Sequence, residues 1–319
     1  MSTTPSIFEC DDGTYTVVGG RHHDRPRART HGFTIVLLNR GGRFNRSATL
    51  GELERLGATE VLCVEPGESA YEVESLSRRM PRVRFVLLHK KLTTGETINL
   101  TIKESGSNSV MVIWNDVTLV PTSAKPIEKA ASRGVLCVVP FARNEKSEII
   151  PTVYAPAFFK NFLRLVAVAP RDDGAPSLFP YDYVGLYNKE KFIGIGGYDP
   201  LITNSYWQKV DFGFRAFMWG ESIVCDPHLR VAYSGLPSPE DTTNDASYAR
   251  FHAKSLSVRF SGDRAILPAS RVVRFVFRSG HGLLRGYRVF ADIRAWVEAN
   301  RYRFRQDARR VTELWEVEQ

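Results

Sequence analysis

Short hydrophobic runs alternate along the first half of the chain with segments of helical character. Four of these runs, at residues 33–38, 59–65, 83–88 and 110–114, are rich in Val, Ile, Leu and Phe. Runs of this length and composition predict strands that are buried on both faces of a sheet. Because strands and helices alternate at short spacing, the pattern favours an α/β fold with a mostly parallel sheet covered by helices.

Polar side chains stand at the carboxyl ends of three of these predicted strands. Asn39 and Arg40 follow the first strand, Glu65 ends the second, and Asn115 and Asp116 follow the fourth. In parallel sheets, ligands bind beyond the carboxyl ends of the strands, so we expect a binding crevice there. No dinucleotide-type glycine motif and no P-loop lysine motif follows the first strand.

A second polar block lies between residues 179 and 226. It begins with a predicted strand at 183–187, continues through a Gly-Gly-Tyr-Asp turn at 196–199, and ends in a predicted helix at 206–219. Within that helix Asp211 and Arg215 are four residues apart and therefore share one face. The polar side chains that this block offers to a cleft are Asp199, Lys209, Asp211 and Arg215.

The order of these motifs resembles the glycosyltransferases with the GT-A fold. The similarity is to the family-2 enzymes and to the polypeptide N-acetylgalactosaminyltransferases. It rests on Trp-Asn-Asp at 114–116, Gly-Gly-Tyr-Asp at 196–199 and Asp-Phe-Gly-Phe-Arg at 211–215, and covers about residues 33–235. The resemblance implies a GT-A-type, Rossmann-like sheet that transfers a sugar from a nucleotide-sugar donor.

The resemblance also implies which residues contact the donor. Asn39 and Arg40 match the nucleotide-contacting loop, and Glu65 matches the acid that holds uracil or ribose. Asn99 matches an Asn in the helix before the fourth strand. The full set implied for donor binding is Asn39, Arg40, Glu65, Asn99, Asn115, Gly197 and Arg215.

A divalent cation, Mn²⁺ or Mg²⁺, is implied at Asp116, which matches the last acid of the family's Asp-x-Asp motif. Two departures from the family pattern reduce the number of metal ligands. Trp114 replaces the first aspartate, and Tyr233 stands where related enzymes carry a histidine. A single protein carboxylate can still share such a cation with a diphosphate.

The catalytic base has more than one candidate. The Glu-Asp pair of the family-2 enzymes falls here on Gln208 and Lys209, and Asp211 lies two residues later. Asp211 could take the acceptor proton through a shifted register, Asp199 could take it, or the mechanism is not inverting. Alternatively, Asp211 and Arg215 form only a structural ion pair on one helix face.

The chain divides into three predicted parts. Residues 1–31 predict a flexible arm, residues 32–235 the GT-A domain, and residues 236–319 a basic, mainly helical region with a long helical segment at 289–318. From residue 271 to residue 310 there are 11 arginines and 3 acidic residues. We expect this region to pack on the sheet domain, with an anionic membrane as a further partner. No nucleic-acid motif accompanies the charge, so nucleic-acid binding ranks last.

The composition of the chain indicates the cellular compartment in which we expect the protein. The chain has 319 residues and a formal net charge of +8, and no apolar run approaches the roughly 20 residues that span a bilayer. The N-terminus does not have a basic start followed by an apolar stretch, so the sequence predicts no signal peptide. The four cysteines, Cys10, Cys63, Cys137 and Cys225, form no C-x-x-C pair and are typical of reduced thiols. We therefore expect a cytoplasmic protein, in contact with the inner face of the membrane if the basic region docks there.

Two functions follow from the motifs. The first is a metal-assisted glycosyltransferase of polysaccharide biosynthesis that uses a UDP-linked donor and a glycan, glycolipid or other hydroxyl acceptor. Asp116 would act at the diphosphate, with Asp211, Asp199 and Lys209 at the acceptor. The alternative is a weakened or inactive descendant that binds glycans or partners, suggested by the departures at Trp114, Lys209 and Tyr233.

Overall fold

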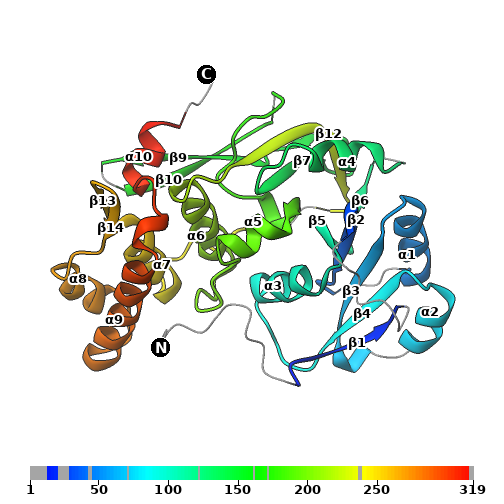
Figure 1. Cartoon of the computed structure of the whole chain (residues 1–319), viewed down its shortest axis with the longest axis horizontal. Coiled ribbons are helices and arrows are strands. Elements are labelled where there is room, and N and C mark those ends of the chain that lie inside the picture. The colour runs from blue at the N-terminus through cyan, green and yellow to red at the C-terminus, as the bar shows by residue number, and fades with distance from the viewer. Residues whose placement is uncertain are drawn as a thin grey trace.

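The computed structural model describes residues 13–20, 29–41, 45–69, 72–120, 123–160, 162–170, 172–235 and 239–315. A ten-stranded sheet runs through its centre, and helices pack against it (Figure 1). The remaining strands form two separate two-stranded hairpins. The predicted α/β architecture with a mostly parallel, helix-covered sheet is confirmed.

The strands are β1 (Tyr15–Gly19), β2 (Arg29–Leu38), β3 (Glu60–Pro66), β4 (Val83–Leu88), β5 (Ser107–Trp114), β6 (Val117–Leu119), β7 (Cys137–Arg143), β8 (Ile149–Ile150), β9 (Val153–Phe159), β10 (Phe162–Val168), β11 (Gly185–Asn188), β12 (Ile223–Tyr233), β13 (Arg259–Ser261) and β14 (Arg264–Ile266). The α-helices are α1 (Arg46–Arg55), α2 (Val73–Arg79), α3 (Thr94–Glu104), α4 (Lys125–Ala131), α5 (Lys189–Gly194), α6 (Ser205–Met218), α7 (Ala246–Phe251), α8 (Arg271–Arg278), α9 (Leu283–Ala299) and α10 (Ala308–Glu313). Short helical turns are η1 (Gly67–Ser69), η2 (Tyr181–Tyr183), η3 (His252–Leu256) and η4 (Arg301–Arg303).

The sheet joins a parallel half to a mixed half. The order is β1-β4-β3-β2-β5-β11-β7-β12-β6, with β8 paired to β7. Strands β4, β3, β2 and β5 are parallel, β11 runs antiparallel between β5 and β7, and β12 is parallel to β7. The carboxyl ends of the four parallel strands therefore meet at one edge, where the sequence predicts the crevice.

Local sequence signals set the helices that frame this edge. Thr93 caps α3, and its hydroxyl and the Glu96 carboxylate satisfy each other's backbone N–H groups in a capping box. Asn204 caps α6 by accepting from the backbone of Tyr206 and Trp207. Both helices consequently begin at fixed positions close to the sheet.

The N-terminal part differs from the flexible arm that the sequence predicts. Tyr15–Gly19 form β1, which pairs antiparallel with β4 at the edge of the main sheet. An alternating Tyr-Thr-Val-Val segment can pair with an exposed strand edge, and this was not recognised from sequence. Residues 1–12 and 21–28 of the predicted arm lie outside the described residues.

The C-terminal region packs on the sheet domain through α6. The indole rings of Trp219 and Trp296 stack with centroids 5.7 Å apart, and Trp219 also contacts the ring of Phe304. The region is mainly helical, as predicted, but the long segment expected at 289–318 is divided between α9 and α10. The proposed domain boundary lies next to residues 236–238, which are outside the described ranges.

Cys63, Cys137 and Cys225 are buried free thiols, and Cys10 lies outside the described residues. Among the residues that the structure describes, no helix combines the length and the apolar character needed to cross a bilayer.

Candidate functional site

A cleft of about 620 Å³ opens at the carboxyl ends of the parallel strands. Its lining comes from the ends of β2 to β5, the loops that follow them and the start of α3: Leu38, Asn39, Val64, Pro66, Gly67, Glu68, Leu88, His89, Lys90, Lys91, Leu92, Thr94, Thr97 and Trp114. A concave site of this size with an apolar floor and a few polar groups suits a small-molecule ligand.

Asn39 is fixed at the edge of this cleft by Glu65. The Asn39 side-chain amide donates to Glu65 Oε2 at 2.9 Å, and Arg46 Nε lies 2.9 Å from Glu65 Oε1. Glu65 is fully buried. Both oxygens of Glu65 therefore have partners, and Glu65 orients Asn39, while its implied role in holding uracil or ribose stays a prediction.

Arg40 is held between two carboxylates and an aromatic ring. Its Nε lies 3.1 Å from Asp116 Oδ1, and its Nη2 lies 2.6 Å from Asp182 Oδ2. The guanidinium carbon lies 4.2 Å from the centroid of the Trp114 ring. Asp116 Oδ1 accepts no hydrogen bond among the described residues, so the ion pair with Arg40 is what offsets the burial of this oxygen. A guanidinium is well suited to such a stacked and paired position.

Asn115 fixes the turn that carries Arg40. Its side-chain oxygen accepts from the backbone N–H of Arg40 at 3.3 Å, and its amide donates to the Gly41 carbonyl at 2.9 Å. Gly41 has a φ of 92°, which a residue without a Cβ adopts readily. Asn39, Arg40, Asn115 and Asp116 are therefore brought together, as the sequence predicts.

Asp182 completes this group and was not found from the sequence. It lies in η2 with a φ of 50°, and Tyr183 beside it has a φ of 63°, an uncommon left-handed pair for non-glycine residues. Trp114 Nε1 donates to the Asp182 carbonyl at 2.8 Å. Burial raises the pKa of Asp182, and the Arg40 guanidinium opposes that rise. Strained backbone of this kind is concentrated at functional sites.

The sequence predicts a divalent cation at Asp116, and the surrounding side chains do not fit one. The Arg40 guanidinium already lies beside Asp116 and over Trp114. Tyr233 donates its hydroxyl to Asp182 at 3.3 Å, and burial raises its pKa well above the usual value, so it stays a phenol. Within the described ranges, no group of three His, Cys, Asp or Glu side chains could hold a metal ion. This donor set favours a fixed organic cation at that position.

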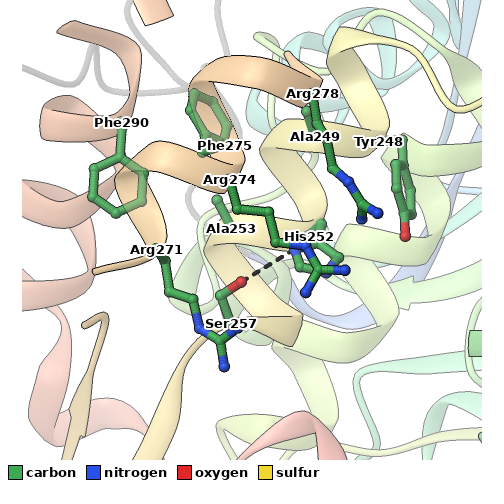
Figure 2. Close-up of a pocket in the computed structure, with 10 residues that line it drawn as sticks. All are labelled: Tyr248, Ala249, His252, Ala253, Ser257, Arg271, Arg274, Phe275, Arg278 and Phe290. Atoms are coloured by element: carbon green, nitrogen blue, oxygen red, sulfur yellow. Dashed lines mark hydrogen bonds between the residues drawn. The ribbon is translucent and has the colours of Figure 1, made fainter. Parts of the chain in front are cut away.

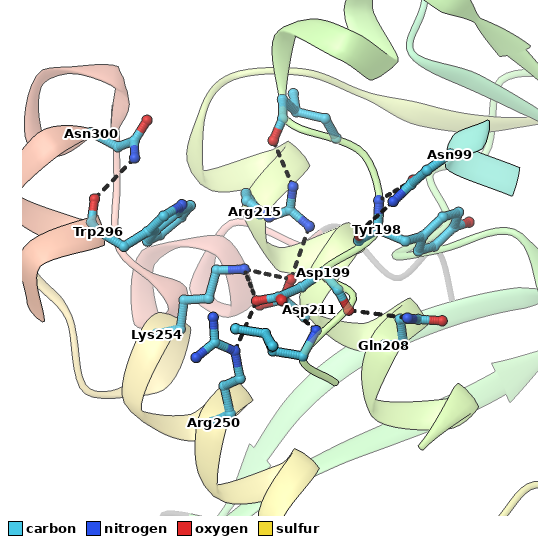
Figure 3. Close-up of polar contacts among 12 residues, drawn as sticks. Asn99, Tyr198, Asp199, Gln208, Asp211, Arg215, Arg250, Lys254, Trp296 and Asn300 are labelled. Atoms are coloured by element: carbon cyan, nitrogen blue, oxygen red, sulfur yellow. Dashed lines mark hydrogen bonds and ion pairs between the residues drawn. The ribbon is translucent and has the colours of Figure 1, made fainter. Parts of the chain in front are cut away.

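A second cluster of predicted site residues is buried away from the cleft (Figure 3). Lys254 of η3 lies between two carboxylates, with its Nζ 2.8 Å from Asp199 Oδ2 and 3.1 Å from Asp211 Oδ2. Arg250 Nε lies 3.0 Å from Asp199 Oδ2, and Arg215 Nη2 lies 2.9 Å from Asp211 Oδ2. These five side chains are almost completely buried.

These contacts count against Asp199 and Asp211 as the catalytic base. Burial by itself would raise the pKa of Asp199, but Arg250 and Lys254 hold it well below its usual range. A base must also reach the acceptor hydroxyl, and the side chain of Asp211 is fully buried and that of Asp199 is 7% exposed. The alternative from the sequence, an ion pair of Asp211 with Arg215 on one helix face, matches the geometry.

The remaining predicted ligands support the Gly-Gly-Tyr-Asp turn. The Asn99 side chain donates to the Tyr198 carbonyl at 2.7 Å and accepts from its N–H at 2.8 Å. Gly197 has a φ of 60°, and a Cβ there would lie 2.5 Å from Asn99 Oδ1. Arg215 Nη1 donates to the Ile195 carbonyl at 2.6 Å. Asn99, Gly197 and Arg215 therefore hold the turn in place and do not line the cleft.

Lys209 lies in a different environment, beside a group of aromatic rings. It is almost fully buried and forms an ion pair with Glu240. Its Nζ lies 5.0 Å from the centroid of the Tyr183 ring and 5.8 Å from that of Phe179. Glu240 follows the sheet domain in the sequence, and no local motif there indicates that it meets Lys209.

Three half-buried tyrosines extend this aromatic group, Tyr154, Tyr181 and Tyr206. The Tyr154 ring lies 4.5 Å from that of Phe179 and 6.2 Å from that of Tyr181. Burial, and next the charge of Glu240, raises the pKa of Tyr206 to about 12, so its hydroxyl keeps its proton at neutral pH. Tyr181 also contacts the ring of Tyr233, which links this surface to Asp182.

Comparison with known proteins gives a match in structure alone. No family model and no curated protein matches the sequence. A solved structure of GalNAc-T7 with UDP, GalNAc and Mn²⁺ superimposes with a TM-score of 0.50 at 12% identity, covering 70% of this chain and 49% of that one. A mannosyltransferase from Pyrobaculum calidifontis, solved with GDP-Man and Mn²⁺, gives a TM-score of 0.41 at 10% identity, covering 83% of this chain and 69% of that one.

The chain thus spans about half the length of GalNAc-T7. At 12% identity such a likeness concerns the fold. It agrees with the strand order and with the cleft at the carboxyl ends of β2 to β5. The chain therefore has the GT-A fold and, in its structure, resembles the N-acetylgalactosaminyltransferases.

Proposed function

We propose that this protein is a glycosyltransferase that moves a sugar from a UDP-linked donor to a hydroxyl of a glycan or glycolipid. The observation that carries the proposal is the cleft of about 620 Å³ at the carboxyl ends of the parallel strands in a GT-A fold. GalNAc-T7, which shares this fold, was solved with UDP and GalNAc bound. Fold likeness alone does not carry activity, so the argument depends on the side chains at the cleft.

The donor half of the proposal uses the strand-end residues. Asn39 offers a fixed amide at the rim of the cleft, and His89, Lys90 and Lys91 line the same cleft after β4. Hydrogen-bonding groups and cations in one concave site suit a nucleotide diphosphate. The Arg40 guanidinium can pair with phosphate oxygens in a bidentate manner, as guanidinium groups commonly do. In the proposed reaction Arg40 stabilises the negative charge that develops on the leaving diphosphate.

The acceptor half uses the aromatic surface. Tyr154, Tyr181 and Tyr206 present partly exposed rings next to the Lys209–Glu240 pair. Flat rings beside hydrogen-bonding groups suit a sugar, which has apolar C–H faces and a polar rim.

Asp182 is the carboxylate that we propose as base. It lies between the donor and acceptor ends, with Arg40 on one side and Tyr233 on the other. A carboxylate whose pKa is raised by burial is a better proton acceptor at neutral pH than an ordinary one. Once the Arg40 guanidinium turns to the diphosphate, the Asp182 oxygens are free to receive the acceptor proton.

The test is binding followed by turnover. Full-length protein is melted with a panel of nucleotides and nucleotide-sugars, since a ligand of the folded state raises the melting temperature by mass action. We expect one nucleotide class to raise it, and Arg40→Ala to remove that shift. Arg78→Ala is the matched control, because Arg78 lies exposed on α2 away from the cleft. A complete lack of any shift with wild-type protein would reject the proposal.

A second function is favoured by one specific observation. Asp199 and Asp211, which belong to the acceptor block of the family resemblance, are buried in ion pairs and unavailable for chemistry. This supports the alternative of a non-catalytic protein that binds a nucleotide-sugar or a glycan. Release of free nucleotide in the presence of an acceptor decides between the two. Binding without release favours the binding module, and release that Asp182→Asn abolishes favours the enzyme.

A further inference from the structure

The most exposed large hydrophobic side chains of the described residues gather at the junction of α8 and α9. Leu284 is 82% exposed and Phe277 is 79% exposed, followed by Leu283 at 70%. Val273 and Tyr287 are also largely exposed. We call these five residues the α8–α9 apolar patch. Water-soluble surfaces rarely gather such side chains without a partner, so the patch calls for an explanation.

The geometry of the two helices explains why these side chains point outward. Val273 and Phe277 are four residues apart and share one face of α8. The opposite side of α8 is anchored by Phe275, whose ring lies 5.6 Å from that of Phe290 on α9. Gly280 and Gly282, with φ values of 68° and 73°, turn the chain between the helices. The two helices thus pack through one pair of faces and leave the apolar patch uncovered.

Arginines are interspersed in the sequence with the residues of the apolar patch, and no acidic residue lies among them. Between residues 264 and 291 there is no Asp or Glu, and Arg271, Arg274, Arg278, Arg285 and Arg288 fall in this segment. On α8, Arg274 and Arg278 alternate with the exposed apolar residues.

Three of these arginines lie around His252 (Figure 2). Burial, and next the charges of Arg274, Arg278 and Arg271, lower the pKa of His252 to about 4. Burial is the larger cause, and the three arginine charges add to it because a further positive charge is disfavoured beside them. Figure 1 has α8 and α9 at the end of the molecule opposite β1 and α2.

We propose that the α8–α9 apolar patch docks this protein on the surface of an anionic lipid bilayer. Phe277, Leu283 and Leu284 would enter the boundary between headgroups and acyl chains, and the arginines would contact lipid phosphates. Helices that lie in the interface combine exposed apolar residues with a basic face in this manner. The complementary charge selects an anionic membrane over a neutral one, since each nearby arginine is attracted to anionic headgroups. This contact is independent of whether the cleft transfers a sugar.

The test uses the full chain and two kinds of vesicle, one of phosphatidylcholine alone and one of phosphatidylcholine with phosphatidylglycerol. We expect wild-type protein to sediment with the anionic vesicles and not with the neutral ones, and added salt to weaken the binding. Phe277→Glu and Leu284→Glu should each weaken binding about tenfold or more, because a carboxylate replaces an apolar group that would enter the bilayer and repels the anionic lipid. Both residues are exposed, so thermal melting of the variants should match wild type.

Phe162→Glu on β10 is the matched control. Phe162 is also an exposed phenylalanine, at 64%, but it lies on the β9–β10 hairpin near Arg164, outside the arginine-rich segment at 271–288. We expect this variant to bind vesicles as wild type does. The proposal is overturned if wild-type protein ignores anionic vesicles, if Phe277→Glu binds them unchanged, or if Phe162→Glu weakens binding equally. It is likewise overturned if the chain binds a DNA oligonucleotide while ignoring vesicles, which would assign the patch to nucleic acid.

Discussion

Lys254 joins the C-terminal region to the sheet domain, and replacing it with methionine tests that connection. Its ammonium group contacts Asp199 in the turn before α6 and Asp211 within α6, and it lies 4.5 Å from the centroid of the Trp296 ring on α9. Methionine keeps most of the side-chain volume and removes the charge. The change therefore isolates the electrostatic part of the contact.

The expected cost follows from burial. At an effective dielectric constant of about 20, two unit charges 2.8 Å apart attract by about 6 kcal/mol, and the desolvation of the buried ions offsets part of this. Lys254 donates a charge-assisted hydrogen bond to each carboxylate, and such bonds contribute about 1.5–3 kcal/mol each, while Arg250 and Arg215 stay as partners of Asp199 and Asp211. Asp211 Oδ1 already lacks a hydrogen-bond partner among the described residues. We therefore expect Lys254→Met to lower the free energy of unfolding by about 3–5 kcal/mol.

Urea unfolding followed by circular dichroism measures this cost, with the m-value as a check that the denatured state is unchanged. The matched control is Arg309→Met on α10, whose ion pair with Glu313 is exposed. Exposed pairs contribute less than about 1 kcal/mol. A double variant, Lys254→Met with Asp211→Asn, should cost less than the sum of the single changes, because each single change already removes the Lys254–Asp211 interaction.

The reasoning is refuted if Lys254→Met costs no more than Arg309→Met. It is also refuted if the single and double variants add without coupling, since the buried charges would then not interact. Because the network spans α6 and η3, we further expect the sheet domain and the C-terminal region of the wild type to unfold in one transition.

Three other outcomes are expected. The pKa of His252 is about 4 in the folded chain and about 6.5 in the unfolded chain. The contribution of His252 to the free energy of unfolding is therefore fully present above about pH 6.5 and is lost as the pH falls toward 4. Relative to His252→Gln, wild-type protein should lose about 2 kcal/mol of unfolding free energy between pH 7 and pH 5, and equal losses would contradict the assignment. Gly213→Ala should destabilise by about 3 kcal/mol or more, because its Cβ would lie 2.0 Å from the Leu178 carbonyl oxygen, whereas Gly51→Ala on α1 meets no atom within 4 Å and should be neutral or stabilising in the same urea titration. Arg40→Ala leaves two carboxylates without their shared cation, so Mn²⁺ should raise the melting temperature of this variant and not that of wild type; an equal shift in both would show that the metal binds elsewhere or beside Arg40.

The sheet could be predicted from sequence because its parallel strands are buried on both faces. Such strands appear as continuous apolar runs, and β2 to β5 each contain one of the predicted segments or most of it. The position of the cleft followed from topology, since polar residues at the ends of parallel strands meet at one edge. Strand β1 was missed because an edge strand carries a weaker pattern, with only part of each face buried.

The partners of the buried carboxylates could not be predicted in the same way. Arg215 is four residues from Asp211 and was found by helix periodicity. Lys254 and Arg250 are 43 to 55 residues away from the carboxylates that they bind, in a region whose docking depends on tertiary packing. Without these cations, Asp199 and Asp211 look like free acids in a cleft. With them, the two carboxylates have a structural explanation, and Asp182 becomes the stronger candidate for the base.

The same limitation explains how the metal site was interpreted. From the sequence, Trp114 replaces an aspartate and counts as a lost ligand. In the structure its ring faces the Arg40 guanidinium at 4.2 Å, and its indole N–H holds the Asp182 backbone. A tryptophan is a poor ligand for a divalent cation but a favourable neighbour for a guanidinium. The loss of the aspartate and the position of Arg40, far earlier in the chain, are therefore two parts of one arrangement, in which a positive charge faces Asp116 without a metal ligand set.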